Sequence, residues 1–168
     1  LFPYTTLFRS GMSCLATVAN KNAAETCGVD LTKQITWDSM LEDGKKLHAE
    51  NPDYYYLNTD TKILCEYVLR PYLRQMTGES FIIDSEKKMS FTREQLVEVL
   101  TYIKDCYDGG VFEPAEDSAT FKGQIHTNPK WMDGKFVFAY GPSSSINLLM
   151  DAVPEAECTV VQMPMANT

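Results

Sequence analysis

The sequence lacks the features that predict membrane spans, zinc sites and disulfide frameworks. It contains no apolar run near the roughly 20 residues that cross a bilayer. It has two histidines, His48 and His126, far apart in the chain, and none of its five cysteines forms a Cys-x-x-Cys pair. Widely spread cysteines in odd number are typical of small buried side chains. We therefore predict no metal site and no cofactor.

Basic residues are also scarce. The chain carries 15 Lys and Arg against 23 Asp and Glu, which gives a net charge of −8. Nucleic acids and anionic lipid surfaces are bound through clustered Lys and Arg that neutralise phosphates. The acidic balance therefore predicts that no nucleic acid is a partner.

The common catalytic motifs are missing as well. There is no P-loop and no Gly-x-Gly-x-x-Gly sequence. The segment Gly141-Pro-Ser143-Ser-Ser145 lacks the final glycine of a nucleophile elbow. We expect no enzyme, although a small hydrolase with Ser143 or a cysteine nucleophile such as Cys106 stays as an alternative, as does an interaction module without a small ligand.

What is present is the composition of a globular protein, with 44% hydrophobic and 23% charged residues in 168. The first ten residues, Leu1–Ser10, resemble a translated sequencing adapter, so we assign residues 1–10 to a non-native scar. Residues 11–168 are then the native part, and we expect that the natural chain extends further.

Hydrophobic periodicity and capping residues predict alternating strands and helices. Strands are predicted over residues 12–18, 54–57, 135–140 and 159–163. Helices are predicted over residues 20–27, 36–48, 60–78, 92–108 and 146–152. Alternation of this kind indicates an α/β layer structure.

Several local signals support these helices. Thr92 and Gln95 form the pattern of a capping box at the start of one helix. Pro71 lies inside another, where its missing N–H predicts a kink. A serine among residues 143–145 is expected to cap the helix that begins at Ile146. Trp37 and Trp131 are expected in the core rather than against a ligand.

Five sequence blocks, in one order, resemble family 1 extracellular solute-binding proteins of bacterial ABC importers, the group that contains the maltose-binding proteins. The blocks are Ala19-Asn-Lys21 with Cys27–Leu31, Ile35–Asp38 with Gly44–Leu47, Phe91–Asp105 with Asp108–Pro114, Trp131–Lys135 with Tyr140-Gly-Pro142, and Cys158–Pro164. Together they span roughly residues 13–165.

The resemblance implies a type II periplasmic-binding-protein fold of two α/β lobes with ligand held between them. The blocks correspond to the second lobe, so residues 11–168 are expected to be one lobe of a truncated protein whose first lobe and C-terminal segments are absent. It further implies a monomer that is a lipoprotein or periplasmic, a sugar or oligosaccharide ligand, and an ABC permease as membrane partner.

Ligand-facing residues of an α/β lobe lie on the loops that follow strands. This rule selects two loops and six candidate binding residues: Tyr56, Asn58, Asp60, Tyr140, Ser143 and Ser144. Two alternatives stay open, namely that Asn58 and Asp60 form a turn and a helix cap, and that the serines cap a helix. Ser143 stands where many sugar binders of this family have a stacking aromatic residue, which makes a maltodextrin-like ligand less certain.

Overall fold

The computed structural model describes residues 14–83 and 85–166. The assigned scar and the first residues of the predicted strand 12–18 therefore lie outside the described residues. The elements are β1 (Leu15–Asn20), α1 (Lys21–Thr26), α2 (Trp37–Glu50), β2 (Tyr55–Asn58), α3 (Thr61–Ile63), the π-helical turn η2 (Leu64–Leu69), α4 (Arg70–Thr77), β3 (Ile82–Ile83), β4 (Lys88–Met89), α5 (Arg93–Asp108), α6 (Ala115–Ala119), the 3-10 turn η3 (Ile125–Thr127), α7 (Pro129–Met132), β5 (Phe136–Pro142), the 3-10 turn η4 (Ser143–Ser145), α8 (Ile146–Asp151) and β6 (Cys158–Val161).

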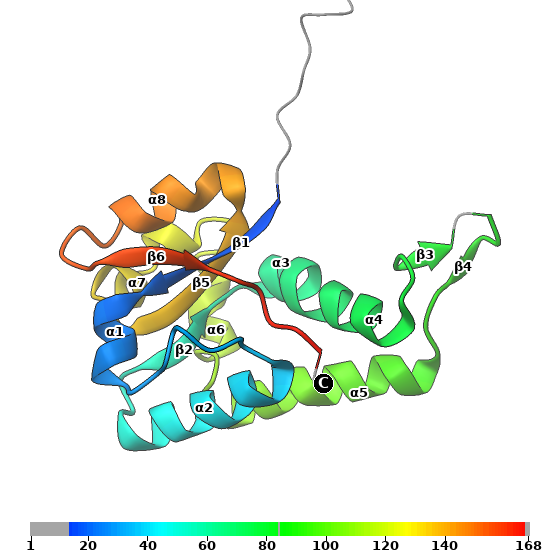
Figure 1. Ribbon diagram of the computed structural model, residues 1–168, viewed down its shortest axis with the longest axis horizontal. Helices are drawn as coiled ribbons and strands as arrows, with labels where there is room; N and C mark the ends of the chain where they lie inside the picture. Colours follow the sequence, from blue (N-terminus) through cyan, green and yellow to red (C-terminus); the bar gives the residue numbers. More distant parts are fainter. Residues whose placement is uncertain (1–13, 84, 167–168) are drawn as a thin grey trace, which may run out of the picture.

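A four-stranded mixed sheet organises the molecule in the order β2-β5-β1-β6 (Figure 1). β2 runs parallel to β5, whereas β1 runs antiparallel to both β5 and β6. The carboxyl ends of β2, β5 and β6 therefore meet at one edge of the sheet, together with the amino end of β1. A separate short hairpin, β3 with β4, projects beyond α4 and α5.

Helices cover both faces of the sheet. Successive residues of the central strand β5, from Phe136 to Tyr140, are all buried, which requires packing on both sides because their side chains alternate between faces. α8 lies on one side of the sheet, and α2 with α5 lies on the other (Figure 1). The predicted α/β class is confirmed.

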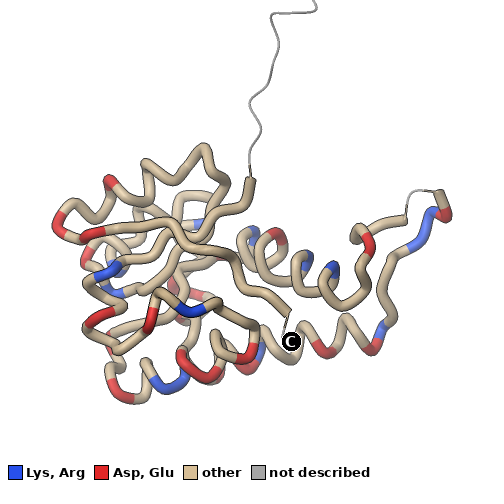
Figure 2. Tube along the Cα trace, viewed as in Figure 1, with Lys and Arg blue, Asp and Glu red and all other residues tan. Residues whose placement is uncertain are grey.

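Charge follows this layering. Acidic and basic residues are distributed along α2 and α5, whereas the strands of the four-stranded sheet carry none (Figure 2). These two helices thus bury an apolar stripe and present a mixed charged face to solvent, as amphipathic helices do.

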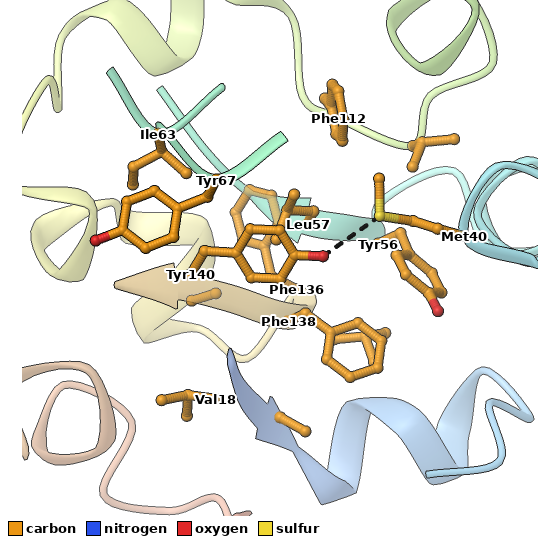
Figure 3. Close-up of a cluster of buried hydrophobic side chains, with 14 of the residues drawn as sticks. Val18, Met40, Tyr56, Leu57, Ile63, Tyr67, Phe112, Phe136, Phe138 and Tyr140 are labelled. Atoms are coloured by element: carbon orange, nitrogen blue, oxygen red, sulfur yellow. Dashed lines mark hydrogen bonds between the residues drawn. The ribbon is translucent and has the colours of Figure 1, made fainter. Parts of the chain in front are cut away.

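The core along β2 and β5 is rich in aromatic side chains. Rings of Tyr56 and Phe138 lie 4.8 Å apart, and Tyr140 from the next inward position donates a hydrogen bond to the sulfur of Met40 at 3.4 Å (Figure 3). Trp37 stacks on Tyr72 at 4.9 Å and is fully buried.

Trp131 is also fully buried, and its indole N–H donates to the carbonyl oxygen of Leu149 at 3.0 Å. The predicted core placement of both tryptophans is confirmed.

Helix caps formed where the sequence predicted them, with one exception. Thr92 and Gln95 form a reciprocal capping box on α5, and Thr36 forms another with Ser39 on α2. The predicted serine cap of α8 is wrong: Ser145 is the N-cap residue, but its side chain makes no capping hydrogen bond. Ser143 is engaged elsewhere, since its Oγ accepts a hydrogen bond from the backbone N–H of Cys14 at 3.2 Å.

Pro71 disturbs its helix by widening it. The elements α3, η2 and α4 form one continuous helix from Thr61 to Thr77, and its middle turn is π-helical. The N–H of Arg70 donates to the carbonyl oxygen of Cys65, five residues earlier, rather than to the residue four earlier. Gly78, with φ of 73°, ends the helix in the left-handed conformation that favours glycine.

Candidate functional site

A hollow of about 350 Å³ opens at the edge where the carboxyl ends of β2 and β5 meet. This is the edge at which open α/β sheets bind ligands, because the loops beyond the strands leave a crevice there. The volume is near the lower end of the range of about 300 to 1,000 Å³ that small-molecule pockets occupy. The lining residues are Asp60, Lys62, Ile63, Glu66, Tyr67, Gly123, Ile125, His126, Tyr140, Gly141, Pro142, Ser145, Leu148 and Leu149.

The carboxylate of Asp60 connects two chain segments at this hollow. Its Oδ1 accepts a hydrogen bond from the N–H of Ile63 at 2.8 Å and so caps α3. Its Oδ2 accepts from the N–H of Gly123, on a loop far along the chain. The carboxylate is buried, and it fixes the 123 loop against the beginning of the helix.

Asn58 and Tyr56 lie behind the hollow and do not line it. Asn58 is fully buried, and its Nδ2 donates to the carbonyl oxygen of Ile125 at 2.8 Å, which holds η3 beside the end of β2. Tyr56 packs its ring into the core against Phe138. Both residues therefore support the wall of the hollow from inside.

The second predicted loop, at the end of β5, contributes backbone atoms and the ring of Tyr140 to the hollow. Tyr140 lines the hollow together with Gly141 and Pro142 at the end of β5. Ser143 and Ser144 do not line it, whereas Ser145 does. Ser143 is tied to the start of β1, because its N–H donates to the carbonyl oxygen of Cys14 at 2.8 Å in addition to the contact of its hydroxyl.

The structure brings residues to the hollow that the sequence analysis did not select. Lys62, Glu66 and Tyr67 come from the helix that follows β2, and His126 comes from η3. The sequence holds a signal for the first three, because a helix capped by Asp60 must begin at the same sheet edge. His126 lies in a stretch without clear periodicity, so no signal identified it.

The chemistry of the lining is mixed. Lys62 and Glu66 bring charges of opposite sign, Ser145 and His126 bring hydrogen-bonding groups, and Leu148, 54% exposed, forms an apolar lip. Such a surface suits a polar, uncharged or weakly charged molecule with several hydroxyl groups, because each polar side chain can pair with one of them.

The alternative of a cysteine nucleophile finds no support at Cys106. Its side chain is fully buried in α5, and burial raises the pKa of the thiol to about 12. A reactive cysteine needs an accessible thiolate near neutral pH. Across residues 14–83 and 85–166, the only side-chain hydrogen bond of Ser143 comes from the N–H of Cys14, so no base is hydrogen-bonded to its hydroxyl.

The described residues also lack the groupings typical of a metal site or a membrane span. Nowhere in them do three or more His, Cys, Asp or Glu side chains converge as a metal site would require. No helix among them is both long and apolar enough to cross a membrane.

Comparisons with known proteins identify the fold. No protein-family model and no curated protein matches the sequence. Solved structures do match. One is a family 1 extracellular solute-binding protein from Alicyclobacillus acidocaldarius, with a TM-score of 0.73, 17% identity, and coverage of 92% of this chain and 37% of that one.

A periplasmic oligogalacturonide-binding protein from Yersinia enterocolitica, in complex with saturated digalacturonic acid, matches with a TM-score of 0.76 and 23% identity, over 92% of this chain and 39% of that one. A de novo designed cysteine esterase matches with a TM-score of 0.79 and 23% identity, over 92% and 38%.

At these identities the likeness establishes the fold, and it is the fold of the solute-binding proteins that the five sequence blocks resemble. The chain spans well under half the length of the structures it matches.

Proposed function

We propose that residues 11–168 form the second lobe of an extracellular solute-binding protein of a bacterial ABC importer, and that the hollow is this lobe's share of a site for a sugar or oligosaccharide. The observation that carries the proposal is the position of the hollow. It lies at the carboxyl edge of the sheet, in a fold shared with solved binding proteins, and polar and aromatic side chains line it.

Sugars suit this lining because they combine hydroxyl groups with apolar ring faces. The phenol ring of Tyr67 and the side chains of Ile63 and Leu149 offer apolar surface, and Glu66 and Ser145 offer hydrogen-bond partners. One of the matched structures holds a digalacturonic acid, an acidic sugar, and Lys62 provides a cation that such a ligand would use.

The proposed mechanism is closure of two lobes. A first lobe outside this sequence would cover the hollow when ligand is bound, and the closed pair would then be recognised by the permease. The full protein would act outside the cytoplasm, in the periplasm or on a lipid anchor, as a monomer and without a cofactor or catalytic step.

A nuclear magnetic resonance titration of the ¹⁵N-labelled chain tests the proposal, because it detects millimolar binding. Maltose and digalacturonate serve as neutral and acidic probes. We expect shifts of the amides around Asp60, Gly123 and Gly141 with at least one probe. Lys62→Gln should weaken digalacturonate binding, whereas Lys104→Gln, on the exposed face of α5, should not. No shift with either probe would overturn the proposal.

A further inference from the structure

Tyr67 is the one aromatic side chain of the helix after β2 that reaches the hollow. Only 4% of it is exposed, and its ring lies 6.4 Å from the ring of Tyr140. The two hydroxyl groups point in opposite directions: that of Tyr140 is directed into the core toward Met40, and that of Tyr67 is directed away from it (Figure 3).

The Tyr67 hydroxyl makes no hydrogen bond with any residue in the described ranges. The hydroxyl oxygen is accessible at the hollow, since the buried side-chain atoms without a partner in the described residues are Thr17 Oγ1, Asn20 Nδ2 and Asn58 Oδ1. Burial also raises the pKa of Tyr67, with a further contribution from the charge of Glu66, so the phenol keeps its proton at neutral pH. The hollow thus contains a hydrogen-bond donor that the rest of the described lobe leaves unused.

The position of Tyr67 depends on the π-helical turn around it. In a regular α-helix the carbonyl oxygen of Tyr67 would accept from the N–H of residue 71, and residue 71 is a proline. Proline has no N–H, and its ring collides with the carbonyl four residues earlier, which here belongs to Tyr67. The widened turn, seen in the bond from Arg70 to Cys65, moves these groups apart.

A π-helical turn contains an extra residue relative to an α-helix, so it rotates the side chains within it relative to those on either side. Glu66 and Tyr67 both lie inside this turn and both line the hollow. Pro71 is the second residue after it and lies outside the hollow.

We propose that Tyr67 selects the ligand of this hollow by donating a hydrogen bond from its hydroxyl, and that the π-helical turn enforced by Pro71 is the positioning device that holds it there. The inference rests on the proposed function, since it concerns the same hollow. Tyr67 binds the ligand, and Pro71 is a positioning residue that acts through Tyr67.

The test compares variants of the full chain in the same titration with maltose and digalacturonate. Tyr67→Phe keeps the ring and removes only the hydroxyl, so we expect binding of the better probe to weaken about three- to tenfold, the usual effect of one uncharged hydrogen bond. Tyr72→Phe is the matched control, because Tyr72 stacks on Trp37 away from the hollow and should leave binding unchanged.

Pro71→Ala tests the positioning role through two readouts of opposite direction. The alanine supplies the missing N–H and releases the requirement for a π-helical turn at this place. We expect weaker ligand binding together with a melting temperature that is unchanged or higher, a combination that general damage to the fold would not produce.

The outcomes separate the two proposals. If the wild-type chain binds a probe and Tyr67→Phe binds it equally well, the role of Tyr67 is overturned and the proposed function stands. If Pro71→Ala binds like the wild type, the positioning role is overturned. If the wild type binds neither probe, the proposed function fails and this inference fails with it.

Discussion

Glu113 is a carboxylate that the protein has buried beside the amide of Asn128 and the ammonium of Lys130. Its Oε1 accepts from Asn128 Nδ2, and its Oε2 lies 3.3 Å from Lys130 Nζ. Lys130 also lies 3.0 Å from Asp117. Burial raises the pKa of Glu113 in spite of the opposing effect of Lys130 and Asn128.

This shift predicts how stability depends on pH. A carboxyl group with a higher pKa in the folded state holds its proton more tightly there. Stability is therefore lost as pH rises from the ordinary glutamate pKa of about 4.3 to the folded value, and is constant above it. We expect Glu113→Gln to remove this part of the pH dependence.

Urea unfolding between pH 4 and pH 7 measures this pH dependence of stability. Glu116→Gln, on the exposed surface of α6, is the control. A wild-type pH profile parallel to that of Glu113→Gln would contradict the prediction.

The cysteines give a second prediction at the scale of single residues. Burial, expected from the sequence for the cysteines, is confirmed for Cys106, whose pKa is raised, and is wrong for Cys14 and Cys65, which are exposed. In the folded protein at pH 8 we expect a thiol reagent to modify Cys14 and Cys65 readily and Cys106 only after unfolding. Mass spectrometry of the digested protein identifies the sites. Rapid modification of Cys106 would reopen the possibility of a cysteine nucleophile.

At the scale of elements, the start of α5 depends on its capping box. Thr92 Oγ1 accepts from the N–H of Gln95 at 3.2 Å, and the Gln95 side chain accepts from the N–H of Thr92 at 2.8 Å. We expect Thr92→Ala to lower the free energy of unfolding by about 1 kcal/mol. Thr101→Ala, exposed in the middle of the same helix, should change it by less than about 0.5 kcal/mol. Equal effects of the two changes would contradict the role of the cap.

Elements with a local chemical signature were predicted well from the sequence. Thr36, Thr92 and Gly78 mark helix ends because their side chains, or the lack of one, act on backbone groups only a few residues away. The short strands were displaced by one to three residues, since pairing with distant strands decides where they begin and end. The π-helical turn was predicted only as a kink at Pro71, because the choice between bending and widening depends on what packs around the helix.

At the scale of the whole molecule, only some of the residues that line the hollow could be predicted from the sequence. Asp60 and Tyr140 line the hollow because Asp60 follows β2 and Tyr140 lies near the end of β5, and both strands end at one sheet edge. Tyr56 and Asn58 do not, because the direction of a side chain at the end of a strand depends on the neighbouring layers. Tyr67 and His126 enter through a helix and a turn whose places are set by tertiary contacts.

The size of the chain relative to its structural neighbours leads to a prediction about affinity. If the hollow is one side of a cleft, the isolated chain lacks the contacts that a covering lobe would add. We expect it to bind sugars weakly, with dissociation constants in the millimolar range that correspond to about −4 kcal/mol. Isothermal titration with the same two probes provides the measurement, and submicromolar binding by the isolated chain would contradict the two-lobe interpretation.

The strand order also dictates when the protein can fold during synthesis. Among the four strands of this sheet β1 is translated first, yet its two neighbours are β5 and β6, with Val18 paired to Ala139 and to Val160. No hairpin can form early in the four-stranded sheet, because each pairing in it joins strands that are distant in sequence. Such non-local pairing slows folding. β1 therefore remains an apolar segment without strand partners until β5 and β6 have been translated, and during this interval the nascent chain is exposed to aggregation.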